Sequence, residues 1–279
     1  MKKLIISSLA VAVLSSCVSN DNPADHRDNT KNNNNGSNGN SAFRLLKKGT
    51  EVIPGKPSYV VEYKYDGNKI LESYSTSDDS KIVYTYNGDY ISKTEEFVGG
   101  VLVRMQEFTY ANGKLVTEKV TDKEQGTLVY TKNYQYVTDT HIKFNEYKSG
   151  TYNSATGTYS NLVFAQADAY LSNNGNIASV SYTHNGTTHN IVNTYDTSHN
   201  AMKNVKGFIE LAITDVHDGQ LSYNNLLTQT ETYSGALNGA NKITAVHTIN
   251  SDNYPTKTVN TFDITGYGTA LTTSLYEYY

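Results

Sequence analysis

The sequence has 279 residues, a formal net charge of −4 at pH 7, 24 tyrosines, no tryptophan and one cysteine. The mildly acidic balance, without a cluster of Lys and Arg, argues against nucleic acid as a partner. With one cysteine, no disulfide can form within the chain, so stability has to come from packing. Tyrosine can bury its ring while its hydroxyl stays in water, so this composition suits a large, half-exposed β-sheet.

Residues 1–16 have the pattern of a targeting segment. Two lysines follow the first Met, and the apolar stretch 4–14 is too short for a stable membrane span. A Leu-Ser-Ser-Cys motif then ends at Cys17. This pattern resembles the lipobox of bacterial lipoproteins, which implies that the signal is cut before Cys17 and that Cys17 is acylated. The alternative is an ordinary signal peptide followed by a buried core thiol.

Residues 17–42 form the second predicted unit, an asparagine-rich tether that follows the acylated cysteine. The stretch has no apolar periodicity and cannot bury enough surface to offset the entropy of ordering. A flexible coil of this length has a root-mean-square reach of about 25–30 Å. We therefore expect the tether to hold a folded domain clear of the lipid, on either the cell surface or the periplasmic face.

Residues 43–279 are predicted to form a single domain of repeated β-hairpins. In residues 61–74, apolar and polar side chains alternate as in a strand with one buried face, and Asp-Gly at Gly67 supplies a tight turn. The same unit recurs at residues 82–91 and 108–115.

The number of hairpins sets the expected shape of the sheet. Turn glycines such as Gly67, Gly88 and Gly113 are 21 and 25 residues apart, which is the length of one hairpin and its connection. About eight hairpins give about 16 strands, and an open sheet of more than about ten strands curls or splits. We predict an all-β fold: an antiparallel meander of hairpins in a large, strongly curled, partly closed sheet. In residues 128–136 one alternation position is filled by Lys132 instead of an apolar side chain.

One segment, residues 200–213, departs from the strand period. Apolar residues from Met202 to Ala212 recur at helical spacing, although Gly207 weakens a helix by about 1 kcal/mol relative to Ala. We predict one short helix there that plugs the mouth or the concave face of the sheet. A continuous strand through residues 208–213 is the alternative.

The hairpin unit resembles a known repeat. Tyr65-Asp66-Gly67, followed by a Lys and a Leu, is similar to the tyrosine-aspartate (YD, Rhs-type) repeat, and Tyr86 and Tyr110 begin related Asn-Gly copies. Most copies lack the Asp, and the Gly-Arg pair of that repeat is absent. The lipobox, the tether and the Tyr-x-Tyr hairpins together resemble uncharacterised Bacteroidota envelope lipoproteins. That resemblance implies an outer-membrane location, held by acyl chains such as palmitate, and implies no known activity.

The sequence offers little catalytic or metal-binding machinery. It has no Gly-x-Ser-x-Gly elbow, and Cys17 is assigned to lipidation. His184 and His189 lie five positions apart across a predicted turn, and a metal site would need a third ligand such as His199 or His217. Solvent-facing histidines are the favoured interpretation, so we predict no catalytic residue, no metal site and no cofactor.

Adjacent acids and repeated tyrosines each allow a second interpretation. Pairs such as Asp78-Asp79 and Glu95-Glu96 could act on glycosidic bonds, but neighbours on a strand point to opposite faces and neighbours in a turn face water. Tyrosine rings could stack on sugars. Because they recur at the same point of each hairpin, they are better explained as scaffold residues.

Three functions follow from these patterns. The first is a non-enzymatic envelope lipoprotein that binds the membrane through Cys17 and has a binding or structural role, with a glycan or an envelope protein as the possible partner. The second is a surface protein that binds or degrades glycans. The third is a periplasmic carrier of apolar cargo, which requires an empty apolar cavity.

Overall fold

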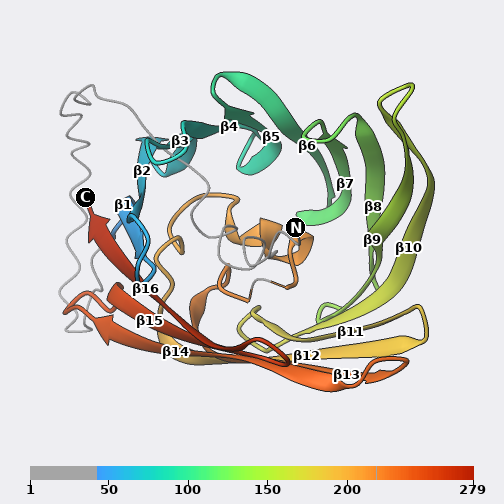
Figure 1. Cartoon of the computed structure of the whole chain (residues 1–279). Helices are drawn as coiled ribbons and strands as arrows, with labels where there is room; N and C mark the ends of the chain where they lie inside the picture. The colour runs from blue at the N-terminus through green and yellow to red at the C-terminus, as the bar shows by residue number, and fades with distance from the viewer. Residues whose placement is uncertain (1–42, 218) are drawn as a thin grey trace.

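The computed structural model describes residues 43–217 and 219–279 and shows an all-β protein (Figure 1). The predicted signal, the lipidation site Cys17 and the tether lie outside the described residues. The elements in chain order are β1 (Leu46–Val52), β2 (Tyr59–Asp66), β3 (Lys69–Ser75), β4 (Ser80–Asn87), β5 (Tyr90–Val98), β6 (Val101–Ala111), β7 (Lys114–Asp122), β8 (Leu128–Tyr136), β9 (His141–Asn153), β10 (Thr158–Leu171), β11 (Ile177–His184), β12 (Thr187–His199), the 3-10 helix η1 (Ile209–Thr214), β13 (Asn224–Gly235), β14 (Gly239–Ile249), β15 (Pro255–Ile264) and β16 (Gly268–Tyr278).

The sheet is a closed barrel. Each strand pairs antiparallel with its neighbours in the sequence, and β1 pairs with β16, from Leu46 opposite Tyr278 to Val52 opposite Thr273. The expected all-β meander of about 16 strands is confirmed, but the expected partly closed sheet is wrong. Closure removes both exposed sheet edges, each of which would otherwise present unpaired backbone groups.

The recurring tyrosine of each hairpin ties that hairpin to the chain before it. The strand register shifts immediately before Tyr65, Tyr86 and Tyr110, which places a bulge at the same point of three hairpins. The Tyr65 hydroxyl donates to the Leu46 carbonyl at 2.8 Å, and the Tyr110 hydroxyl to the Ile91 carbonyl at 2.9 Å. These tyrosines are therefore scaffold groups.

The inner face of the wall is apolar over much of its area, and the outer face carries ion pairs and threonines together with exposed apolar side chains such as Val192, Val246 and Leu271. The buried wall residues pack in one cluster with residues from the segment that connects β12 to β13. Side chains on the alternate, outward positions of the first ten strands form ion pairs, namely Lys64–Glu72, Lys81–Glu72, Lys93–Glu95, Lys119–Glu107 and Lys143–Asp168. The outward positions of β11–β16 carry many threonines, namely Thr183, Thr188, Thr194, Thr228, Thr230, Thr232, Thr244, Thr261 and Thr273.

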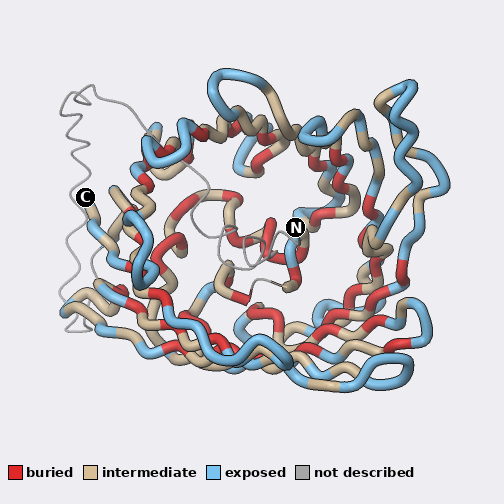
Figure 2. Tube along the Cα trace, in the orientation of Figure 1, coloured by how far each residue is buried: buried red, intermediate tan, exposed pale blue. Residues whose placement is uncertain are grey.

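The connection between β12 and β13, residues 200–217 and 219–223, lies inside the barrel and is called the inner segment here (Figures 1 and 2). The predicted helix over residues 200–213 is wrong in extent, because only η1 is helical and the preceding residues form turns. The alternative of a continuous strand is also wrong. The expected position on the concave side of the sheet is confirmed. No helix in the described part of the chain has the length and apolarity that crossing a bilayer requires.

Gly207 explains why the helix does not extend through the inner segment. Its φ is +68°, a left-handed conformation that ends helical geometry and that L side chains rarely adopt. A Cβ there would lie 2.8 Å from the Asp89 carbonyl oxygen and 3.0 Å from the Ile91 nitrogen, both in the chain around the β4–β5 turn. Two hydrogen bonds of 2.9 Å hold the segment here, from Lys206 N to Asn68 O and from the Tyr86 hydroxyl to Lys206 O.

Replacing Gly207 by Ala should therefore destabilise the protein more than the same change at Gly67. Gly67 also has a positive φ, of +58°, but a Cβ there meets nothing within 4 Å. We expect Gly67→Ala to lower the free energy of unfolding by about 1 kcal/mol through backbone strain alone, and Gly207→Ala by more than about 2 kcal/mol. Urea denaturation followed by circular dichroism measures both, and equal losses would contradict the packing described here.

Candidate ligand cavity inside the barrel

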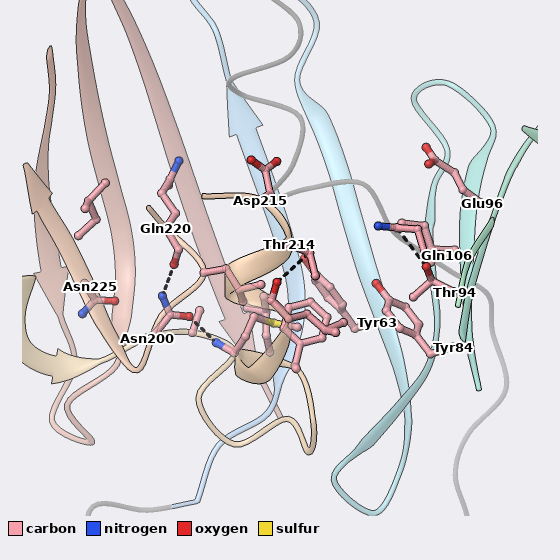
Figure 3. Close-up of a pocket in the computed structure, with 18 of the residues that line it drawn as sticks. Tyr63, Tyr84, Thr94, Glu96, Gln106, Asn200, Thr214, Asp215, Gln220 and Asn225 are labelled. Carbon is pink, nitrogen blue, oxygen red and sulfur yellow. Dashed lines mark hydrogen bonds between the residues drawn. The ribbon is translucent and has the colours of Figure 1, made fainter. Parts of the chain in front are cut away.

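A cavity of about 370 Å³, called the inner cavity here, lies between the barrel wall and the inner segment (Figure 3). This volume is within the range of small-molecule sites. Tyr63, Tyr84 and Thr94 line it from the wall, and Asn200 and Met202 line it from the inner segment. The cavity therefore exists only because the segment fills part of the barrel and leaves part of it open.

Part of the lining of the inner cavity is apolar and aromatic. Tyr84 on β4 and Phe208 of the inner segment pack with ring centroids 6.0 Å apart, and Phe108, Met202 and Leu211 also line the cavity. The wall residues are inward positions of the strand alternation, which is why they meet the apolar residues of the inner segment. This part of the lining suits an apolar group of a ligand.

A chain of hydrogen bonds that crosses four strands runs beside these residues. The Thr94 hydroxyl donates to Gln106 Oε1 at 3.2 Å (Figure 3). Gln106 Nε2 donates to Glu118 Oε1 at 2.7 Å. The Tyr134 hydroxyl donates to the second carboxylate oxygen of Glu118 at 2.8 Å. The Glu118 side chain is only 1% exposed. Its two oxygens are thus both occupied, and the carboxylate is fixed as a fully buried acceptor.

Lys132 is a buried cation that lines the cavity. Its Nζ donates to the Thr214 carbonyl at 2.7 Å and lies 3.2 Å from Glu146 and 3.7 Å from Glu118. Burial lowers the pKa of Lys132, but Glu118 and Glu146 outweigh burial, so the pKa lies above its ordinary value. Lys132 therefore stays charged and connects the wall to the end of η1.

Glu96 on β5 and Arg104 on β6 are a second pair of oppositely charged residues, and they lie directly opposite each other in the sheet. Burial raises the pKa of Glu96, and the Arg104 guanidinium only partly offsets this effect. Burial also works to lower the pKa of Arg104, but nearby Tyr130 and Glu118 outweigh it and the pKa is raised. Arg104 Nε is buried and has no hydrogen-bond partner among the described residues. Arg104 also lines the inner cavity, so another part of its side chain faces the space that a ligand would occupy.

The wall beside Lys132 is closed by side chains. Strands β8 and β9 pair at three positions only. Beyond these, the Asn145 amide replaces the backbone ladder, accepting from Asn133 N at 2.6 Å and donating to the Thr131 carbonyl at 2.9 Å. Further along, the rings of Tyr130 and Tyr147 stack with centroids 4.6 Å apart. This stretch is the least regular part of the wall around the cavity.

The histidines singled out in the sequence do not form one site. His189 faces inward, where its Nδ1 lies 2.9 Å from Glu231 and its ring stacks on Tyr182 at 4.6 Å. His217 meets the same tyrosine edge-on at 5.7 Å, and burial lowers its pKa. The expectation of solvent-facing histidines is wrong for these two residues, because the inner segment covers the end of the barrel where they lie. In the described ranges, no three His, Cys, Asp or Glu side chains come together as metal ligands. His199 lies elsewhere, with its Nδ1 2.8 Å from Lys203 Nζ, and His184 lies at the end of β11.

The adjacent acids are placed as expected. Glu95 points outward and pairs with Lys93 at 2.7 Å, whereas Glu96 lines the inner cavity. Asp78 and Asp79 lie in an exposed turn. The sequence analysis missed Arg104, Lys132 and Glu146 as members of a cavity, and Glu118 as the buried acid behind it. The signal was Lys132, a charged residue at an inward position of an otherwise apolar alternation.

The comparisons with known proteins do not assign the chain to a family. No protein-family model matches the chain, and no curated protein matches it. Solved structures similar to this chain include a porin-like protein from Bacteroides vulgatus ATCC 8482, with a TM-score of 0.43 and 11% identity over 85% of this chain and 99% of that chain. Another is a porin-like protein from Bacteroides uniformis ATCC 8492, with a TM-score of 0.40 and 10% identity over 84% of this chain and 96% of that chain. Similarity at this level assigns no function.

Replacing Lys132 by Met should destabilise the protein strongly, because it leaves Glu118 and Glu146 buried without their shared cation. We expect a loss of about 3–5 kcal/mol in the free energy of unfolding. The matched control is Lys119→Met on the outer face, where Nζ lies 2.6 Å from Glu107 in an ion pair that water screens. There we expect a loss below about 1 kcal/mol. Equilibrium urea unfolding of both variants tests this, and similar losses would show that the interior pair is not desolvated as described.

Proposed function

We propose that this chain is a lipid-anchored protein of the cell envelope whose barrel binds a small molecule in the inner cavity and performs no chemistry on it. The observation that carries the proposal is the inner cavity itself, which is lined by both charged and aromatic residues. The anchor is Cys17, and its support is the lipobox pattern of the sequence. In this account the tether connects the anchor at the outer membrane to the barrel.

The polarity of the wall supports a barrel that lies in water beside the membrane. Barrels that span a bilayer present an apolar band outward and a polar interior, and a Lys facing the lipid midplane costs about 2–4 kcal/mol. The outward side chains of this wall include ion pairs such as Lys119–Glu107 as well as exposed apolar residues such as Val246, and an apolar cluster lies inside. Water solvates the outward charges, which would be costly in lipid.

Binding fits the interior better than either alternative. A glycan-degrading site needs two free carboxylates across a cleft. Of the three carboxylates that line this cavity, Glu146 lies within 4 Å of the Lys132 ammonium and Glu96 lies directly opposite Arg104, so two of the three are placed beside a cation. A carrier of apolar cargo needs an empty apolar lumen, whereas the inner segment fills this one and Arg104 lines what remains.

The anchor is tested by replacing Cys17 with Ser in the full chain, expressed in a Gram-negative host with lipoprotein export. We expect the wild type to fractionate with membranes and to incorporate labelled palmitate, and the variant to lose both properties. Protease treatment of intact cells then reports which side the barrel faces. A wild-type protein that carries no acyl chain would refute the anchor.

The cavity is tested by filling it. Ala245 lines the cavity and is 5% exposed, whereas its neighbour Val246 points outward and is 65% exposed. A calorimetric screen of the wild type with amino acids, dipeptides, monosaccharides and disaccharides identifies a ligand. We expect Ala245→Phe to abolish binding of that ligand and Val246→Phe to leave its affinity unchanged. Retention of a ligand by Ala245→Phe, with native circular dichroism, would place binding elsewhere.

A further inference from the structure

The chemistry around the inner cavity identifies the class of ligand. We propose that the cavity binds a zwitterion, namely a short peptide or amino acid with free amino and carboxyl termini and apolar side chains. This inference rests on the proposed function, because it assigns the ligand of the same cavity. It rests on the unsatisfied donor of Arg104, on the balance of charge around the cavity and on the apolar residues that line it.

The first step is the unsatisfied donor. Arg104 Nε is buried beside the cavity without a hydrogen-bond partner among the described residues. A buried donor left unpaired costs about 1–3 kcal/mol, and a ligand acceptor would remove that cost once the Arg104 side chain turns its guanidinium into the cavity that it lines. The planar fork of a guanidinium matches the two oxygens of a carboxylate. The ligand is therefore expected to bring a carboxylate to Arg104.

The second step is the balance of charge, which rejects a simple anion. The ionisable Lys, Arg, Asp and Glu residues that line the cavity are three acids, Glu96, Glu146 and Asp215, and two bases, Arg104 and Lys132. Lys132 is already held between Glu146 and the buried Glu118. A ligand that brought only negative charge would add to this excess of acid in a poorly solvated place. An ammonium group beside the carboxylate would instead offset it, with Glu96 or Asp215 as acceptor.

The third step is the apolar part of the lining. Tyr84, Phe208 and Met202 line the same cavity, and Tyr84 lies directly opposite Thr94, two residues from Glu96 on β5. A volume of about 370 Å³ equals the share of about a dozen waters in the liquid, at about 30 Å³ each. Apolar side chains of a ligand can displace these waters, which is the part of binding that the hydrophobic effect drives.

The test compares one dipeptide with its blocked forms on the full-length, detergent-solubilised wild-type protein. The probes are Leu-Phe, N-acetyl-Leu-Phe, Leu-Phe-amide and maltose, each titrated by isothermal calorimetry. We expect Leu-Phe to bind at least ten times more tightly than either blocked form, and maltose not to bind. Because this comparison uses the wild type, it does not depend on the folding of a variant.

The variants then assign the carboxylate contact. Arg104→Gln should weaken Leu-Phe at least tenfold and remove the preference over Leu-Phe-amide, while Lys119→Gln on the outer face changes neither. Equal affinity for blocked and free dipeptides, or no dipeptide binding, would overturn the zwitterion assignment. If maltose binds and Ala245→Phe abolishes it, the proposed function stands and this inference falls. If no compound binds in the calorimetric screen, both fall.

Discussion

A closed barrel of 16 strands encloses more space than its own side chains can fill, and the rest of this structure depends on how that space is filled. The chain solves the problem with the inner segment, whose Met202, Val205 and Leu211 join the apolar cluster of the wall. Backbone contacts fix its position, including the bond from Lys206 N to Asn68 O. Wall and segment are therefore one packing unit, and neither has a core without the other.

The same arrangement explains why a charged cavity exists inside an apolar core. Buried ionic groups are generally less favourable than apolar residues of the same size, so they are retained where they serve specificity or binding. Lys132 links β8 to the end of η1, and Glu118 is held by neighbours on both sides. Arg104 differs, because its Nε has no partner within the described ranges. The interior thus contains charges whose contacts hold the structure together and one buried donor without a partner.

Local features of the fold could be predicted from the sequence, and features set by distant contacts could not. Alternation and turn glycines such as Gly67 define the hairpins, since both signals lie within a few residues. Closure depends on Leu46 meeting Tyr278, which no periodicity encodes. The prediction of a helix over residues 200–213 was wrong at Gly207, because the β4–β5 turn packs against this residue and sets its backbone conformation. The cavity was missed because the alternation along a strand shows which residues share a face, but not which inward charges come together across strands. Lys132 was the one charged residue that stood out at an inward position of an apolar alternation.

The most direct test of the account is native-state hydrogen exchange on the full-length protein in increasing urea. The Lys206 amide donates to Asn68 and reports the inner segment, and the Leu171 amide at the end of β10 donates to the Thr140 carbonyl at 2.8 Å and reports the wall. If segment and wall are one packing unit, both amides exchange through the same global opening, with the same free energy and the same dependence on urea. Exchange of Lys206 at a clearly lower free energy, while Leu171 stays protected, would show that the barrel stands without its inner segment.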